Sequence, residues 1–140
     1  ALIEQKTGVD IPTIFEHEGE KGFRDRESKV LKEISNSKNT VIGTGGGIII
    51  SEENREIIKR LGFIVYLTAS IKELVYRTEH DKNRPLIKNE DAESTMKLLI
   101  SEREKFYEDC ADIKISTDDY DATKISKMII NKYENNNSKA

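Results

Sequence analysis

The sequence predicts an α/β fold with a parallel sheet. Helical and strand patterns alternate along its 140 residues, and this alternation is typical of parallel sheets covered by helices. Residues 63–68 are continuously apolar, as in strands that are buried on both faces. Neither an internal repeat nor a Pro/Ser-rich linker divides the sequence, so we expect one domain over residues 1–134 and a disordered tail over 135–140.

The first half of the sequence predicts a helix, a strand and a second helix. Residues 27–34 place their apolar side chains on one helical face, and residues 40–43 form a short apolar strand. Ser51 is a suitable N-cap for a helix that runs through residue 60, and Gly62 is suited to end it.

The second half continues the alternation around one long polar loop. The apolar strand 63–68 is followed by a helix, and a charged stretch that contains Pro85 interrupts the pattern after it. The remaining predicted elements are a helix over 71–78, a loop over 80–91, a helix over 93–109, a strand over 112–117 and a helix over 121–133. Three strands are few for this number of helices.

The composition excludes several classes of protein. With 23 Lys+Arg and 26 Asp+Glu the net charge is −3, which offers no general attraction for nucleic acid or anionic membranes. Cys110 is the single cysteine, so no internal disulfide can form. The longest apolar runs are far shorter than the ~20 residues of a membrane-spanning helix. We expect a cytoplasmic location, and any anionic ligand must be bound by individually placed cations.

A glycine run directly after the first predicted strand is the strongest candidate for a binding site. Gly45, Gly46 and Gly47 follow Thr44, and glycines allow backbone N–H groups to approach a ligand closely. Ligands in open α/β sheets bind at the carboxyl ends of strands, where this loop lies. The alternative is a tight strand-to-helix turn. The run is not a Walker A loop, since the sequence contains no Gly-Lys-Ser/Thr.

Three arginines outside this loop are further candidates. Arg24 and Glu27 share a helical face, so the carboxylate could orient the guanidinium for a second carboxylate or a phosphate; a surface ion pair is the alternative. Arg84 precedes Pro85 in the long loop, which could be a lid or an ordinary charged loop. Arg103 lies on a highly charged helix, where a solvent-exposed position is the simpler interpretation.

Metal and thiol chemistry are not indicated. His17 and His80 do not have metal-ligand spacing with each other or with Cys110, so we assign no metal site. Cys110 has no histidine near it in the sequence, and we expect a packed thiol.

Taken together, these segments resemble the shikimate kinase family. The resemblance rests on Phe23-Arg24 with Glu27, on residues 44–47 and on Arg84-Pro85-Leu86, and it extends to Arg103 with Tyr107 and to Ala111-Asp112. It covers nearly the whole chain. It implies a P-loop kinase-like, three-layer fold with a five-stranded parallel sheet and a lid over about residues 80–92. It also implies ATP-dependent phosphorylation of the 3-hydroxyl of shikimate, with Mg²⁺, and a monomer.

The resemblance also implies roles for individual residues. Arg24 and Arg103 would bind the shikimate carboxylate, Glu27 would orient Arg24, and Arg84 would be the catalytic lid arginine that meets the ATP phosphates. The glycines at 45, 46 and 47 would contact shikimate. Arg77 and Tyr120 would lie at the nucleotide.

The sequence departs from the family pattern at its N-terminal end. The family begins with a strand, a Walker A loop, a helix and a second strand that ends in Asp-x-Asp, and Ala1 matches the position after the second aspartate. We therefore expect that the chain is part of a longer kinase, and that the 140 residues alone are unstable and without turnover. An inactive paralogue that binds shikimate or a partner is one alternative. A P-loop kinase for another carboxylate, such as gluconate, is another.

Overall fold

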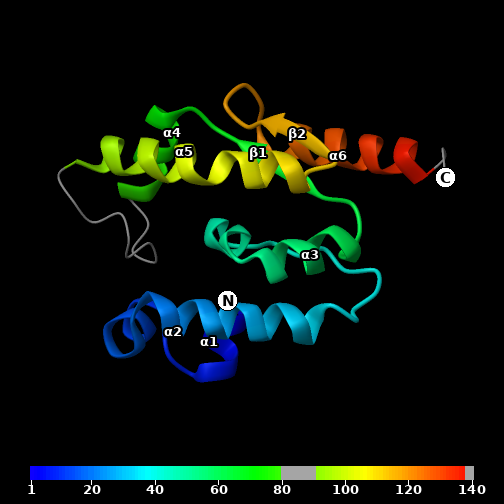
Figure 1. Cartoon of the computed structure of the whole chain (residues 1–140). Helices are drawn as coiled ribbons and strands as arrows, with labels where there is room; N and C mark the ends of the chain where they lie inside the picture. The colour runs from blue at the N-terminus through cyan, green and yellow to red at the C-terminus, as the bar shows by residue number, and fades with distance from the viewer. Residues whose placement is uncertain (80–90, 138–140) are drawn as a thin grey trace.

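The protein folds as an α/β structure in which a small parallel sheet lies among the helices of one part of the molecule (Figure 1). The computed structural model describes residues 1–79 and 91–137. Its elements in chain order are α1 (Leu2–Thr7), α2 (Ile11–Ile34), the 3-10 helix η1 (Gly46–Ile50), α3 (Glu52–Leu61), β1 (Val65–Thr68), α4 (Ile71–Glu79), α5 (Ala92–Cys110), β2 (Ile113–Ser116) and α6 (Ala122–Asn137).

The elements are arranged in layers. In Figure 1, α1 and α2 lie together at the bottom, and α4, α5, α6 and the sheet lie at the top. Between them lie η1 and α3, which contact both α2 and α5. The glycine run that leads into η1 therefore lies between the two outer layers.

The sheet consists of β1 and β2, paired in parallel, within the part of the chain that the structure describes. Val65 lies opposite Ile113, and Thr68 lies opposite Ser116. The connection between the strands passes through α4 and α5, as parallel pairing requires. Both strands consequently end at the same edge of the sheet, and both were predicted from the sequence with slightly wider bounds.

The third predicted strand, over residues 40–43, is not formed. Residues 40–45 have neither helical nor strand structure, and Val41 is 99% exposed. An apolar run becomes a strand when its backbone N–H and C=O groups pair with a neighbouring strand. Among the described residues no strand pairs with residues 40–43, so their apolar character was not sufficient to form a strand.

The helix predicted over 27–34 is the end of a much longer element. Asp10 caps α2 by accepting a hydrogen bond from the Thr13 backbone N–H at 2.9 Å. Gly19 interrupts the helix with a positive φ of 70°, a conformation that glycine adopts without strain. The segment after Gly19 buries Phe23, Glu27 and Leu31, which are spaced four residues apart and therefore lie on one face.

The helix predicted after Ser51 is confirmed, with its cap. Ser51 accepts a hydrogen bond from the Asn54 backbone N–H at 3.3 Å, and Gly62 ends α3 with a φ of 157°. The buried Asn54 side chain donates to Ser28 Oγ at 3.0 Å and to the Ile48 carbonyl at 3.2 Å. This one amide therefore joins α2, η1 and α3.

The last part of the chain matches the prediction with one correction. Helix α5 begins and ends within one residue of the predicted bounds and buries Met96 and Cys110. Helix α6 continues to residue 137, so the first half of the predicted tail is helical. Phe63 packs edge-to-face on Tyr133 of α6, at 5.7 Å between ring centroids. Among the described helices, none combines the length and apolarity needed to cross a membrane.

Candidate functional site

Arg24 lies on the buried face of α2 with two carboxylates beside it. Its Nη1 donates to Glu27 Oε1 at 2.9 Å, and its Nη2 lies 3.6 Å from Glu20 Oε1. The Arg24 side chain is 23% exposed and that of Glu27 is 8% exposed. The pair predicted from the three-residue spacing is confirmed, and it is a largely buried pair rather than a surface one.

Glu27 is a buried carboxylate near two cations. Burial raises its pKa above the ordinary value, while Arg24 and, more weakly, Arg103 act in the opposite direction. Its Oε1 accepts the hydrogen bond from Arg24. An anchored acceptor of this kind fixes the orientation of a guanidinium and leaves its other N–H groups available to a ligand.

The three consecutive glycines each approach a different side chain of the site. A Cβ on Gly47 would lie 2.2 Å from Cζ of Arg24, and one on Gly46 would lie 2.9 Å from Oη of Tyr107. A Cβ on Gly45 would lie 3.5 Å from Oε2 of Glu27. A side chain at position 47 would overlap the Arg24 guanidinium and one at 46 would crowd the Tyr107 hydroxyl, whereas position 45 leaves ordinary contact distance.

Arg103 reaches the same loop from α5, on the opposite side. Its Nη1 lies 3.8 Å from the position that a Cβ on Gly46 would take. No hydrogen bond or ion pair joins the Arg103 guanidinium to another described residue. Arg103 is half-buried beside the glycine loop rather than fully exposed on its helix. The loop brings Arg24 and Arg103, 79 residues apart in the sequence, to neighbouring glycines.

A cavity of about 360 Å³ lies beside Arg103, between α2 and α5. Its apolar lining residues are Ile50, Leu99 and Phe106, and its charged lining residues are Glu20, Glu102 and Arg103. The cavity gives a small, partly apolar molecule access to the face of α5 that carries Arg103.

Tyr107 belongs to this site, although the sequence analysis named it beside Arg103 without giving it a role. Its hydroxyl donates to the Gly46 carbonyl at 2.7 Å, and its ring stacks on Tyr66 at 4.9 Å between centroids. It lies one helical turn after Arg103, so the two share a face of α5. That four-residue spacing was the available signal. Tyr107 fixes the middle of the glycine loop against α5.

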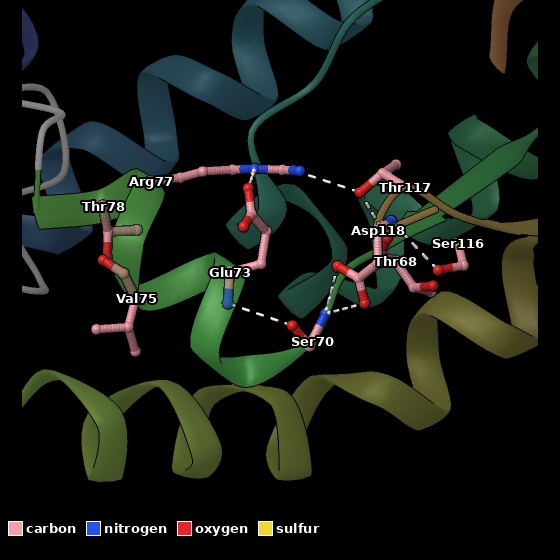
Figure 2. A network of polar contacts seen from close by, with 9 residues as sticks. All are labelled: Thr68, Ser70, Glu73, Val75, Arg77, Thr78, Ser116, Thr117 and Asp118. Carbon is pink, nitrogen blue, oxygen red and sulfur yellow. Dashed lines mark hydrogen bonds and ion pairs between the residues drawn. The ribbon is translucent and has the colours of Figure 1, made fainter. Parts of the chain in front are cut away.

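A second group of polar residues gathers at the carboxyl ends of β1 and β2 (Figure 2). Arg77, on α4, donates from Nε to Glu73 Oε1 at 2.7 Å and from Nη1 to Thr117 Oγ1 at 3.3 Å. Asp118 accepts the Ser70 backbone N–H on both carboxylate oxygens, at 3.0 and 3.1 Å. Arg77 therefore lies at the edge where ligands bind in open parallel sheets. Thr117 was not selected from the sequence.

The other residues predicted to contact the nucleotide do not all lie beside Arg77. Tyr120 follows the Thr117–Asp118 turn, and its ring lies 4.6 Å from Nζ of Lys124 rather than against Arg77. Arg84 and most of the predicted lid lie outside the described residues.

Neither a metal site nor a reactive thiol is found in the described part of the chain. No three His, Cys, Asp or Glu side chains between residues 1 and 79 or 91 and 137 are grouped so that they could hold a metal ion. Burial raises the pKa of the Cys110 thiol, which keeps it protonated and unreactive. The prediction of a packed thiol is confirmed.

Comparison with known proteins shows which family has this sequence and fold. The family model described as "Shikimate kinase" matches residues 1–134. A shikimate kinase of Cupriavidus pinatubonensis is 42% identical over 132 residues, which are 94% of this chain and 69% of the relative. One of Burkholderia lata is 46% identical over 115 residues, 82% of this chain and 62% of the relative. The chain thus spans about two thirds of the length of these two relatives.

Solved structures give the same result. A shikimate kinase from Acinetobacter baumannii in complex with shikimate has a TM-score of 0.92 and 41% identity, covering 96% of this chain and 75% of that one. A shikimate kinase from Aquifex aeolicus has a TM-score of 0.79 and 36% identity, covering 96% of this chain and 78% of that one.

Proposed function

This chain belongs to the shikimate kinase family and has its P-loop kinase fold, and from that premise we propose that it phosphorylates the 3-hydroxyl of shikimate with ATP. The product would be shikimate 3-phosphate. The proposal covers the protein as its gene encodes it, whatever residues that includes beyond these 140.

One observation carries the choice of substrate. Arg24 and Arg103, from two different helices, reach neighbouring glycines of one loop, and Arg24 is already oriented by Glu27. Two guanidinium groups suit a single planar carboxylate, because each offers a fork of N–H donors. Shikimate has one carboxylate on a small ring, and a relative with a TM-score of 0.92 is described in complex with it.

The glycine loop has a second role in this proposal. Gly45, Gly46 and Gly47 have no side chains to keep shikimate away from the backbone, so the ring can lie directly against the loop. The hydrogen bond from Tyr107 to the Gly46 carbonyl holds the loop at a fixed distance from Arg103. Phosphoryl transfer depends mainly on such positioning, since little covalent chemistry is required of the protein.

The nucleotide would bind at the carboxyl edge of the sheet. Arg77 and Tyr120 are our candidates for contacts with ATP, and Arg84 for the lid arginine that meets its phosphates. The family implies ATP as co-substrate and Mg²⁺. The carboxylates of the described residues do not gather into a cation site, so no step is assigned here to magnesium.

A second candidate function follows from one further observation. The 140 residues contain no Gly-Lys-Ser/Thr, the part of a Walker A loop that binds the phosphates and the metal. A Walker A loop is needed to turn over ATP but not to bind the shikimate carboxylate, so the second candidate is a protein that binds shikimate without turnover. If the encoded protein behaves in the same way, it is a shikimate-binding relative rather than a kinase.

Calorimetric titration with shikimate, followed by a coupled assay for ADP, tests both functions. Arg24→Ala should weaken shikimate binding about 10- to 100-fold, the effect of losing a charge-assisted hydrogen-bonding group. Arg26→Ala is the matched control, because Arg26 is on the same helix but pairs with Glu18 on an exposed face.

Each outcome has a distinct meaning. Shikimate binding with ADP release indicates the kinase, and binding without ADP release indicates the binding protein. Tighter binding or faster turnover with gluconate than with shikimate would contradict the assignment of the substrate. Equal effects of Arg24→Ala and Arg26→Ala would contradict the assignment of the site.

A further inference from the structure

The loop that follows β2 holds Arg77 through a side-chain hydroxyl. Thr117 Oγ1 donates its single proton to the Thr68 carbonyl at 2.8 Å, which leaves the oxygen lone pairs free to accept from Arg77 Nη1 at 3.3 Å. The Thr117 backbone N–H donates to the same carbonyl at 2.8 Å. The acceptor that Arg77 meets is therefore fixed to the end of β1 by two hydrogen bonds.

Glu73 holds the same guanidinium from the other side. Its Oε1 accepts from Arg77 Nε at 2.7 Å, one turn earlier on α4. Figure 2 shows the guanidinium reaching from α4 toward Thr117, with Glu73 beside its Nε. Of the five N–H groups of an arginine, two are used in these contacts. The other three have no hydrogen-bond partner among the described residues.

The residues that support this pair are joined to one another by hydrogen bonds. Asp118 accepts the Ser70 backbone N–H on both oxygens, and Ser70 Oγ accepts the Glu73 backbone N–H at 3.3 Å. The turns after β1 and β2 and the first turn of α4 are thereby joined. Arg77 is held by two residues that belong to this joined unit.

We propose that Thr117 is a positioning residue for nucleotide binding, acting through Arg77. This rests on the proposed function, in which Arg77 contacts ATP. An arginine side chain loses considerable conformational freedom when it becomes fixed on a ligand. The Thr117 hydroxyl fixes it beforehand, with three donor groups left for the nucleotide, so that less freedom is lost when ATP binds.

The test measures ATP and shikimate binding separately by calorimetry, on the protein as its gene encodes it. Thr117→Val keeps the shape of the side chain and removes the hydroxyl. We expect it to weaken ATP binding about two- to tenfold, the range that corresponds to immobilising one flexible side chain, and to leave shikimate binding unchanged. Thr117→Ser should restore ATP binding.

A double-mutant cycle with Arg77→Ala separates positioning from a structural role. If Thr117 acts through Arg77, Thr117→Val has no further effect on ATP binding once Arg77 is replaced. Thr7→Val is the matched control, because Thr7 Oγ1 makes a comparable, partly buried hydrogen bond to the Ile3 carbonyl at 2.9 Å. It should leave ATP binding at the wild-type value.

The results that overturn the proposal are specific. The proposal is contradicted if Thr117→Val leaves ATP binding unchanged, or if it weakens ATP and shikimate binding equally. It is also contradicted if the effects of Thr117→Val and Arg77→Ala on ATP binding are additive. Absence of ATP binding by the wild-type protein would contradict it as well. If the wild type binds ATP but not shikimate, and Thr117→Val weakens that ATP binding, the proposed function is contradicted and this inference stands.

Discussion

Two arginines of this protein are each held by a glutamate on the same helix, and the environments of the two pairs differ. Arg24 and Glu27 are 23% and 8% exposed, and the backbone of Gly47 lies directly against the guanidinium. Arg77 and Glu73 are 48% and 39% exposed, and the second support of Arg77 is the hydroxyl of Thr117. Close backbone packing fixes the first arginine, and exposed side-chain hydrogen bonds fix the second.

The difference predicts how each pair responds to change. A buried ion pair that loses one partner leaves an uncompensated charge, whereas an exposed pair is already compensated by water. The Arg24 region should therefore show large effects on folding and binding together. The Arg77 region should show small effects that are confined to one ligand.

The largest effect is expected from Gly47→Ala. The new Cβ would lie 2.2 Å from Cζ of Arg24, so either the loop or the guanidinium must move. We expect a loss of about 1–3 kcal/mol in the free energy of unfolding, the range for overpacked sites, together with loss of shikimate binding. Chemical denaturation and calorimetry measure the two quantities.

Gly43→Ala is the matched control, since nothing lies within 4 Å of the position that its Cβ would take. This variant should fold and bind as the wild type does. A Gly47→Ala protein with wild-type stability and shikimate affinity would show that the backbone does not fix Arg24.

A smaller effect, with a defined pH dependence, is expected from Glu27. Burial raises its pKa above the ordinary value of 4.5. Between the ordinary and the raised pKa the folded protein binds this proton and the unfolded chain releases it, so the free energy of unfolding falls as the pH rises through that interval. Glu27→Gln removes this contribution.

Denaturation of the wild type and of Glu27→Gln across the pH range just above 4.5 measures the difference. The stability of the wild type relative to the variant should decrease as the pH rises. A difference that increases with pH instead would mean that the attraction of Arg24 and Arg103 outweighs burial.

The smallest effect is expected from Glu73→Gln. The Glu73–Arg77 pair is exposed and spaced i,i+4, and such pairs contribute about 0.3–0.5 kcal/mol. The free energy of unfolding should fall by that amount or less, with shikimate binding unchanged. A loss as large as that of Gly47→Ala would remove the contrast between the two regions.

The same contrast describes what the sequence could and could not predict. The Arg24–Glu27 pair and the Ser51 cap depend on residues three apart, so their spacing was sufficient. Tyr107 on the Gly46 carbonyl and Thr117 on the Thr68 carbonyl join residues 61 and 49 positions apart. Nothing in the local sequence indicates such pairs.

Non-local pairing also explains the one strand that was wrongly predicted. The strands near residues 65 and 113 formed because each pairs with the other. Val41 belongs to an equally apolar run, but among the described residues it has no paired neighbour and is fully exposed. The resemblance implied a binding role for Arg103, but the charged surroundings on its helix did not by themselves reveal that the glycine loop lies against it.

Calorimetric titration with shikimate and with shikimate methyl ester tests the carboxylate-binding role of Arg24 and Arg103 most directly. The ester keeps the ring and its hydroxyls and removes the negative charge. We expect the wild type to bind the ester about 100-fold or more weakly than the acid, the effect of losing two charge-assisted contacts. A variant with both Arg24→Ala and Arg103→Ala should bind the two ligands equally. Equal affinity of the wild type for the acid and the ester would contradict that role.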